Sequence, residues 1–229
     1  MQWYWLGEYL PKFIDGLIIT LQLLSISIAI GMALAIPIGL VQVTGPRWLA
    51  IPARAFCTVI RGTPLLIQLW LLYYGLGSLF PMFPGIRESF LWPVLRDAFP
   101  YAILAFSLSV AGYEGEVMRG AFKGVPKGEL EAARAFGMSR FTLLRRIWLP
   151  RALQNVLPTL AGEFVLTLKS TPLAATITVF DVYGVGSIVR QETYRIYEPL
   201  LLVAGIYICL SALIVLFFRW LEGRVPRPV

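Results

Sequence analysis

Glu163 is the residue whose type and position most clearly suggest chemistry, because it is an acid inside the apolar stretch of residues 152–180. An ionisable side chain in a membrane-spanning segment is costly, and it generally faces a partner or a water-filled cavity. On a helix, Thr167 and Ser170 follow Glu163 at i+4 and i+7, so the three side chains make one polar stripe. A carboxylate on this stripe suits a ligand with an ammonium, guanidinium or imidazolium group. The alternative is structural pairing of Glu163 with an arginine or lysine elsewhere in the chain.

Lys169 is a second charge in the same stretch. It lies about 120° around the helix from Glu163, so the two do not pair simply within the helix. It could bind the carboxylate of a ligand, or it could be a structural charge close to Pro172, where we expect the helix to break. The residues alone leave both roles open.

Residues 129–150, here called the basic segment, are polar and arginine-rich yet lie between apolar stretches. We expect two short amphipathic helices joined by a sharp corner, since Gly137 suits the left-handed cap of the first and Ser139 is a common N-cap for the second. Such a hairpin would either lie on the membrane and hold anionic lipid or dock a cytosolic partner. In the second helix we expect an apolar stripe of Phe141, Leu144 and Trp148.

The composition indicates which elements hold Glu163, Lys169 and the basic segment in place. Of the 229 residues, 58% are hydrophobic and only 14% are charged, which is typical of a polytopic membrane protein. The apolar stretches predict an all-α protein in which residues 1–229 form a single transmembrane domain. The five expected spans lie near residues 16–44, 55–79, 98–118, 152–180 and 199–219.

Local signals refine two of these spans and their orientation. Gly62 and Pro64 weaken the second span, so a bend or break is expected there. At the end of the third span, Glu116 and Arg119 are placed at i, i+3 and can pair on one helix face. The links after the first and third spans and the C-terminal tail are rich in Lys and Arg. The positive-inside rule therefore predicts an external N-terminus and a cytoplasmic C-terminus.

Several classes of function are disfavoured by the residues. The net charge of +7 fits cytoplasmic loops better than nucleic acid, because no basic stripe is interleaved with stacking aromatics. The chain has no histidine and only two cysteines, which argues against a metal site. Its carboxylates are scattered, so no catalytic cluster is expected. No G-x4-G-K-[ST] loop is present, so we expect no ATP site and no other cofactor in this chain.

The basic segment also carries a recognisable motif. Its pattern is E-A-A-x3-G-x9-I-x-L-P, met by Glu131, Ala132, Ala133, Gly137, Ile147, Leu149 and Pro150. This pattern resembles the EAA loop in the permease subunits of bacterial ABC importers. Residues 61–68, RGTPLLIQ, resemble the signature of the polar amino acid permeases, which handle histidine, arginine, lysine, glutamine and opines. Residues 168–173 are similar to the Lys-x-Thr-Ser-Leu segment of the same group, with Pro172 where serine is commoner. The resemblance covers nearly the whole chain.

This resemblance implies a type I ABC importer permease fold and a division of labour. The EAA loop would be a coupling helix that inserts into a groove on an ATP-binding subunit, with Glu131, Ala132, Ala133 and Gly137 at the contact. Two such subunits would bind ATP and Mg and hydrolyse the ATP, so this chain would not be an enzyme. A second permease subunit, identical or homologous, would complete the pathway in the bacterial cytoplasmic (inner) membrane. An extracytoplasmic binding protein would deliver the substrate.

Related permeases place a substrate pocket midway through the membrane, using the helix that corresponds to residues 152–180. By this resemblance, Leu166 and Tyr113 would complete a pocket with Glu163, Thr167 and Ser170. The expected substrates are basic amino acids (histidine, lysine, arginine and ornithine) or opines. An importer for glutamine or another polar amino acid is the alternative. A stand-alone secondary transporter would show an internal repeat, and none is visible in the sequence.

Overall fold

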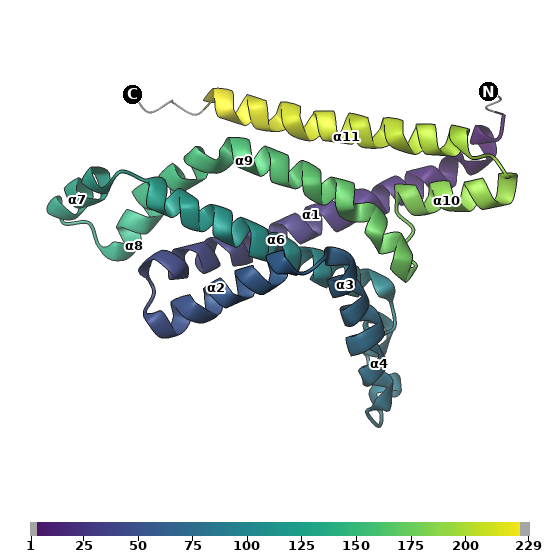
Figure 1. Cartoon of the computed structure of the whole chain (residues 1–229), viewed down its shortest axis with the longest axis horizontal. Coiled ribbons are helices and arrows are strands. Elements are labelled where there is room, and N and C mark those ends of the chain that lie inside the picture. Colours follow the sequence, from purple (N-terminus) through teal and green to yellow (C-terminus); the bar gives the residue numbers. More distant parts are fainter. Residues whose placement is uncertain (1–3, 225–229) are drawn as a thin grey trace. The chain divides into compact units, whose positions relative to one another are not determined.

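The computed structural model describes residues 4–224, and over this range the chain is helical with no strand (Figure 1). The predicted all-α class is confirmed. The two ends of the predicted domain, residues 1–3 and 225–229, lie outside the described residues. The described chain divides into two compact units. The first contains residues 4–29, 63–108 and 166–212, and the second contains residues 30–62, 109–165 and 213–224.

Four long helices contribute residues to both units, and the shorter elements belong to one unit each. The long helices are α1 (Leu6–Thr44), α6 (Ala98–Gly124), α9 (Leu149–Ser170) and α11 (Tyr197–Arg224). The first unit also holds α3 (Leu65–Trp70), the π-helix η1 (Leu71–Leu76), α4 (Gly77–Leu79), η2 (Phe80–Met82), η3 (Ile86–Glu88), α5 (Trp92–Leu95), the 3-10 helix η5 (Thr171–Ile177) and α10 (Val182–Thr193). The second unit also holds α2 (Arg47–Gly62), α7 (Lys127–Ala135), α8 (Arg140–Leu143) and the π-helix η4 (Leu144–Trp148).

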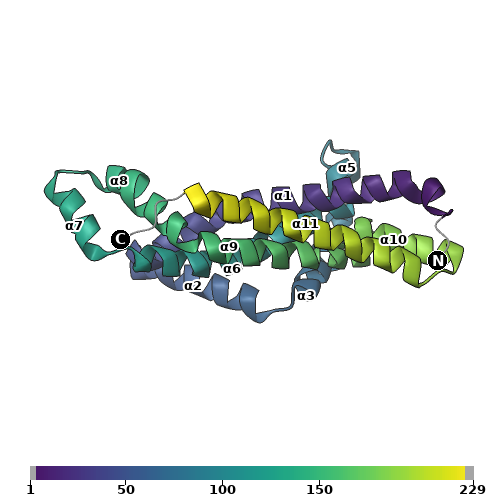
Figure 2. The same ribbon diagram turned by 90° about the horizontal axis from the view of Figure 1, so that it is seen from above.

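The first unit has two apolar clusters. One surrounds Phe106 of α6 and joins it to Leu23 of α1, Leu69 of α3 and Ile177 of η5. The other joins the start of α1 to α10 and to the early turns of α11, which lie side by side (Figure 2). Helices α10 and α11 approach closely at Gly186 of α10, where an added Cβ would lie only 2.5 Å from Cγ2 of Val203 on α11.

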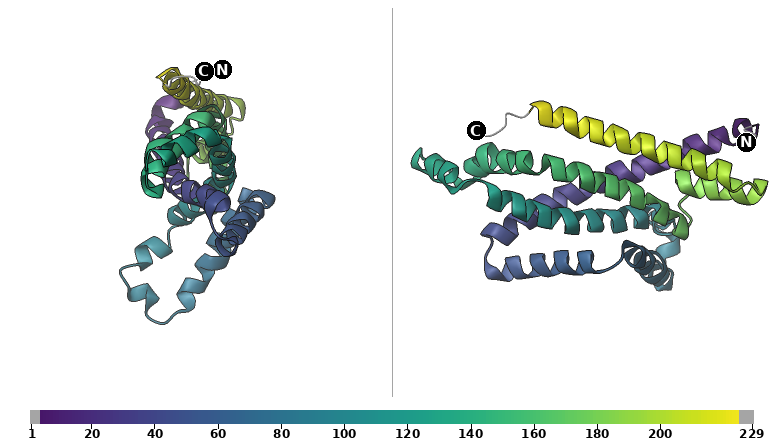
Figure 3. Two further views of the ribbon diagram at one scale, coloured as in Figure 1. Left: turned by 90° about the vertical axis from the view of Figure 1, so that its left-hand side faces the viewer. Right: turned by 45° about the horizontal axis from the view of Figure 1, so that its top comes forward.

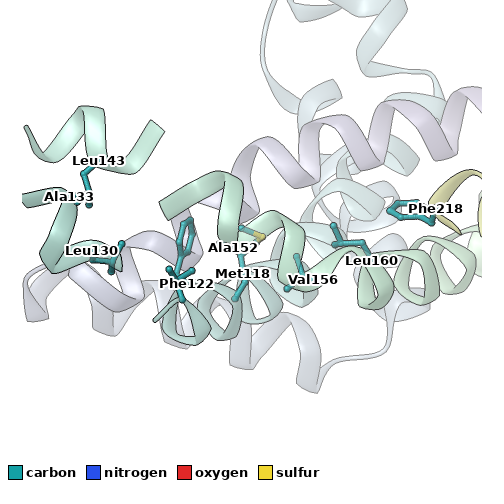
Figure 4. Close-up of a cluster of buried hydrophobic side chains, with 11 residues drawn as sticks. Met118, Phe122, Leu130, Ala133, Leu143, Ala152, Val156, Leu160 and Phe218 are labelled. Atoms are coloured by element: carbon teal, nitrogen blue, oxygen red, sulfur yellow. The ribbon is translucent and has the colours of Figure 1, made fainter. Parts of the chain in front are cut away.

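The second unit has one large apolar cluster, in which α6, α7, α8, α9 and α11 all take part (Figure 4). Met118 and Phe122 of α6 pack with Ala152, Val156 and Leu160 of α9. Helix α2 runs alongside α6 in the right-hand view of Figure 3. The two backbones are close there, since a Cβ on Gly112 would lie 2.5 Å from Ile60 Cγ2.

The breaks expected from glycine and proline are confirmed. Helix α2 ends at Gly62 and α3 begins at Leu65, with the extended Pro64 between them. Helix α9 ends at Ser170, and Pro172 lies in the first turn of η5. Proline fixes φ and lacks an N–H donor, so it starts a helical segment more readily than it continues one.

Among the described residues, three helices are long and apolar enough to cross a membrane: Leu6–Thr44, Leu65–Met82 and Tyr197–Arg224. The pair Arg140–Ile177 and Val182–Thr193 makes a fourth if the two helices count as one broken span. Helix α6 matches the predicted third span and extends beyond it to Gly124. The number of spans, five, therefore stays a prediction.

Candidate functional site

The predicted polar stripe lies on one unbroken helix, because α9 runs from Leu149 to Ser170. The boundary between the units falls between residues 165 and 166. Tyr113 and Glu163 thus belong to the second unit, whereas Leu166, Thr167 and Ser170 belong to the first. Glu163 is half-buried and Leu166 is exposed.

Ser170 and Tyr113 already have contacts inside the chain. The Ser170 hydroxyl donates to the Leu166 carbonyl oxygen at 2.9 Å, which is a common back-bond within a helix. In the second unit, the Arg61 guanidinium lies 5.8 Å from the centre of the Tyr113 ring, within range of a cation–π interaction. The predicted Glu116–Arg119 pair is also confirmed, with Arg119 Nε donating to Glu116 Oε1 at 2.7 Å.

Sequence reasoning missed Glu114 as a candidate. Its side chain is only 2% exposed, and its Oε2 atom accepts no hydrogen bond from the described residues. It belongs to the same unit as Glu163, and the two carboxyl groups are close enough to interact electrostatically. The sequence did contain a signal for the burial of Glu114. Val110, Glu114 and Met118 follow one another at i, i+4, i+8, and all three lie on the buried face of α6.

The basic segment contains the corner that its residues predicted. Gly137 has φ +77°, in the left-handed region that favours glycine. Its N–H donates to the Arg134 carbonyl at 2.9 Å, and the Met138 N–H donates to the Ala133 carbonyl at 3.2 Å. These two bonds define a Schellman cap at the end of α7. The predicted N-cap is confirmed as well, because Ser139 Oγ accepts from the Thr142 N–H at 3.2 Å.

The apolar face after this corner agrees with the expected stripe at Leu144 and Trp148, which pack against the apolar cluster of the second unit, and differs from it at Phe141. Phe141 is 70% exposed, and the buried residue of α8 is Leu143. The reason is that α8 has a single turn and then continues as the π-helix η4, so the ordinary helical period does not hold through residue 148. Phe136, which caps α7, is 87% exposed. Two phenylalanine rings therefore project from the basic segment without being buried by it.

Two polar contacts fix the basic segment to the rest of its unit. Arg151 of α9 donates to both carboxylate oxygens of Glu129, at 2.9 and 2.7 Å. Mainly through these hydrogen bonds, Arg151 lowers the pKa of the Glu129 carboxyl below its usual value. The Trp148 indole N–H donates to the Phe122 carbonyl at 2.9 Å, and the two rings meet edge to face. A hollow of about 520 Å³ lies between α7 and the start of α9, with Ala132 and Ala133 in its wall.

No group of three or more His, Cys, Asp or Glu side chains within residues 4–224 is arranged to hold a metal ion.

The described chain carries a capped basic hairpin between the long helices α6 and α9, and comparison with known proteins identifies its family. The sequence profile of the family described as binding-protein-dependent transport system inner membrane component matches residues 27–227. The chain belongs to this family.

The relatives narrow the class further. The octopine transport system permease protein of Rhizobium radiobacter is 41% identical over 217 residues, which cover 95% of this chain and 87% of the relative. The histidine/lysine/arginine/ornithine transport system permease protein of Escherichia coli (strain K12) is 36% identical over 209 residues, covering 91% and 87% respectively. This chain is thus a permease subunit of the ABC importers for amino acids and opines.

Solved structures of ABC transporter chains have folds similar to that of this chain. A chain from an amino acid ABC transporter crystallised with histidines superposes with a TM-score of 0.81 at 30% identity, over 98% of this chain and 99% of that chain. A chain of the inward-facing MetNI methionine ABC transporter has a TM-score of 0.76 at 18% identity, covering 93% and 96%, and so supports the fold alone. Permeases of this family work with ATPase and substrate-binding partners, and they are not themselves catalytic.

Proposed function

We propose that this chain forms half of a translocation pathway for basic amino acids or opines, and that Glu163 meets the cationic group of the substrate. The single observation that carries the proposal is a half-buried carboxylate on a membrane helix, in a chain whose relatives are named for octopine and for histidine, lysine, arginine and ornithine. The side chains of these four amino acids all carry nitrogen groups that can be cationic. Leu166, Thr167, Ser170 and Tyr113 complete the proposed site.

We also propose that the basic segment docks on a cytosolic ATPase. The exposed Phe136 and Phe141 would provide apolar contacts. Glu131, Ala132, Ala133 and Gly137 would shape the docking surface of the basic segment. The Schellman cap and the ion pair between Arg151 and Glu129 support this proposal, because they fix the corner of the basic segment and tie its first helix to the start of α9. Two ATPase subunits bind ATP and Mg, a second permease lies beside this one, and an external binding protein delivers the substrate. We further propose five spans in the inner membrane, with the N-terminus outside and the C-terminus in the cytoplasm, as the positive-inside rule predicts.

The Glu163→Gln variant tests the substrate role. A hydrogen bond to a charged group contributes about 1.5–3 kcal/mol, and 1.4 kcal/mol is a factor of ten, so we expect uptake of arginine at low concentration to fall by about ten- to a hundredfold. The assay is uptake of radiolabelled arginine, lysine and glutamine by the complete complex in proteoliposomes. Glu222→Gln removes the same charge from α11 and is the control. Unchanged arginine uptake would remove Glu163 from the site, and preferred glutamine uptake by the unmodified complex would favour the alternative substrate.

A further inference from the structure

The segment that follows α9 in the first unit has an unusual backbone. Seven residues, Thr171–Ile177, form the 3-10 helix η5, although such helices seldom exceed three or four residues. The next residue, Thr178, has φ +68°. A β-branched residue in the left-handed region is strained and persists only where its surroundings hold it. The segment must therefore be held by specific contacts.

The strongest of these contacts come from Asp181, which is completely buried. Its Oδ1 accepts from the Gly184 N–H at 2.9 Å, so it is the N-cap of α10. Its other oxygen, Oδ2, accepts from the Tyr207 hydroxyl at 2.7 Å and from the Thr171 hydroxyl at 3.3 Å. The hydroxyls of Thr171 and Tyr207 are themselves 2.8 Å apart. The Asp181 side chain thus joins η5, α10 and α11 at one buried point.

A second pair of contacts holds η5 from another side. The Trp70 indole N–H donates to Thr176 Oγ1 at 3.1 Å, and the Tyr74 hydroxyl donates to the Thr176 carbonyl at 3.2 Å. Elements α3 and η1 therefore hold η5 near its C-terminal end. Because both its first and sixth residues are tied, the 3-10 segment cannot relax at one end alone.

We propose that Asp181 is a positioning residue for the substrate site, acting through Thr171 and Tyr207. Thr171 directly follows Ser170, so its anchoring to Asp181 and Tyr207 fixes the last turn of α9, which carries Thr167 and Ser170. This inference rests on the proposed function, because it needs these two side chains to face the substrate. Misplacing a binding group by a fraction of an ångström weakens its hydrogen bonds, since their strength falls steeply with geometry.

A purely structural role for Asp181 is the competing explanation, because an N-cap alone stabilises α10. Tyr207→Phe separates the two explanations. It removes one hydroxyl from the Oδ2 side and leaves the cap bond to Gly184 intact. Tyr183→Phe is the matched control, because it removes the same atom from α10 in the same unit, and that hydroxyl forms no hydrogen bond with any residue in the range 4–224. A merely structural contact would change the melting temperature and leave ligand affinity unaltered.

The experiment measures equilibrium binding of radiolabelled arginine to the complete detergent-purified complex without the external binding protein, together with its melting temperature. Tyr207→Phe should raise the Kd for arginine by about two- to tenfold, the range for one ordinary hydrogen bond. Tyr183→Phe should leave the Kd unchanged. Equal Kd values for the two variants would overturn the positioning role.

Two further results are decisive. If Tyr207→Phe does not assemble, Thr171→Val takes its place. This variant removes the hydroxyl that contacts both Asp181 and Tyr207, and an unaltered Kd in it would overturn the proposal. Wild-type complex that binds neither arginine, lysine nor histidine would overturn the proposed function and this inference with it. Normal wild-type binding with no effect of Tyr207→Phe would refute the inference alone.

Discussion

Trp148 holds the basic segment to α6, and its replacement by phenylalanine has a cost that follows from the backbone it contacts. The Phe122 carbonyl would ordinarily accept from the N–H four residues later, but that residue is Pro126, which has no N–H. The Trp148 indole supplies the missing donor at 2.9 Å. Trp148→Phe keeps an aromatic ring against Phe122 and deletes this donor.

The expected destabilisation is that of a buried carbonyl left without a partner, about 1–3 kcal/mol. For a chain of this size, each kcal/mol lowers the melting temperature by about 2–4 °C if unfolding is two-state. The assay is thermal unfolding of the purified complex, followed by the loss of arginine-stimulated ATPase activity after heating. A complex whose basic segment is held less firmly should also transport less arginine per ATP hydrolysed.

Trp48→Phe is the matched control for this prediction. Trp48 lies on α2 in the same unit and is 72% exposed, so its replacement should shift the melting temperature little. If the Trp148→Phe and Trp48→Phe complexes have the same melting temperature and transport the same amount of arginine per ATP hydrolysed, the indole hydrogen bond does not anchor the basic segment.

Two further substitutions test the packing and the corner of the second unit. Gly39→Ala places a Cβ 2.7 Å from Met118 Cβ and 2.9 Å from the Arg119 nitrogen, so it should cost about 1–3 kcal/mol of stability. Gly120→Ala, where a Cβ meets nothing within 4 Å, should be neutral or stabilising, and equal melting temperatures for the two variants would contradict the close approach of α1 to α6. Gly137→Val forces a β-branched residue to φ +77°, so it should uncouple or release the ATPase without preventing membrane insertion, whereas Gly128→Val in open space should not. Retention of the ATPase subunit with fully coupled turnover in Gly137→Val would refute the docking role.

The features that local chemistry controls could be predicted from the sequence. Gly137 and Ser139 predicted the corner because a left-handed cap and an N-cap depend on the residue at that position. Pro64 and Pro172 predicted helix breaks for the same reason. The all-α membrane class followed from composition, and the EAA pattern indicated the family before the comparisons confirmed it.

Features that depend on distant residues could not be predicted in this way. The Asp181 contacts join residues 171, 181 and 207, and no short pattern links them. Within the predicted apolar stripe, the prediction for Phe141 was wrong, because the π-helix after Leu143 changes the helical period that would align Phe141 with Trp148. Glu114 was overlooked because its burial depends on the packing of α6 within its unit, although its spacing from Val110 and Met118 was visible.

The most direct test of the account is ATP-dependent arginine uptake by proteoliposomes that contain this chain, its partner permease and the ATPase, supplied with the arginine-loaded binding protein. The account predicts uptake only when ATP and the ATPase subunits are present, and a loss of about ten- to a hundredfold in Glu163→Gln. Uptake by the permease chains alone, driven by an ion gradient and independent of ATP, would contradict it.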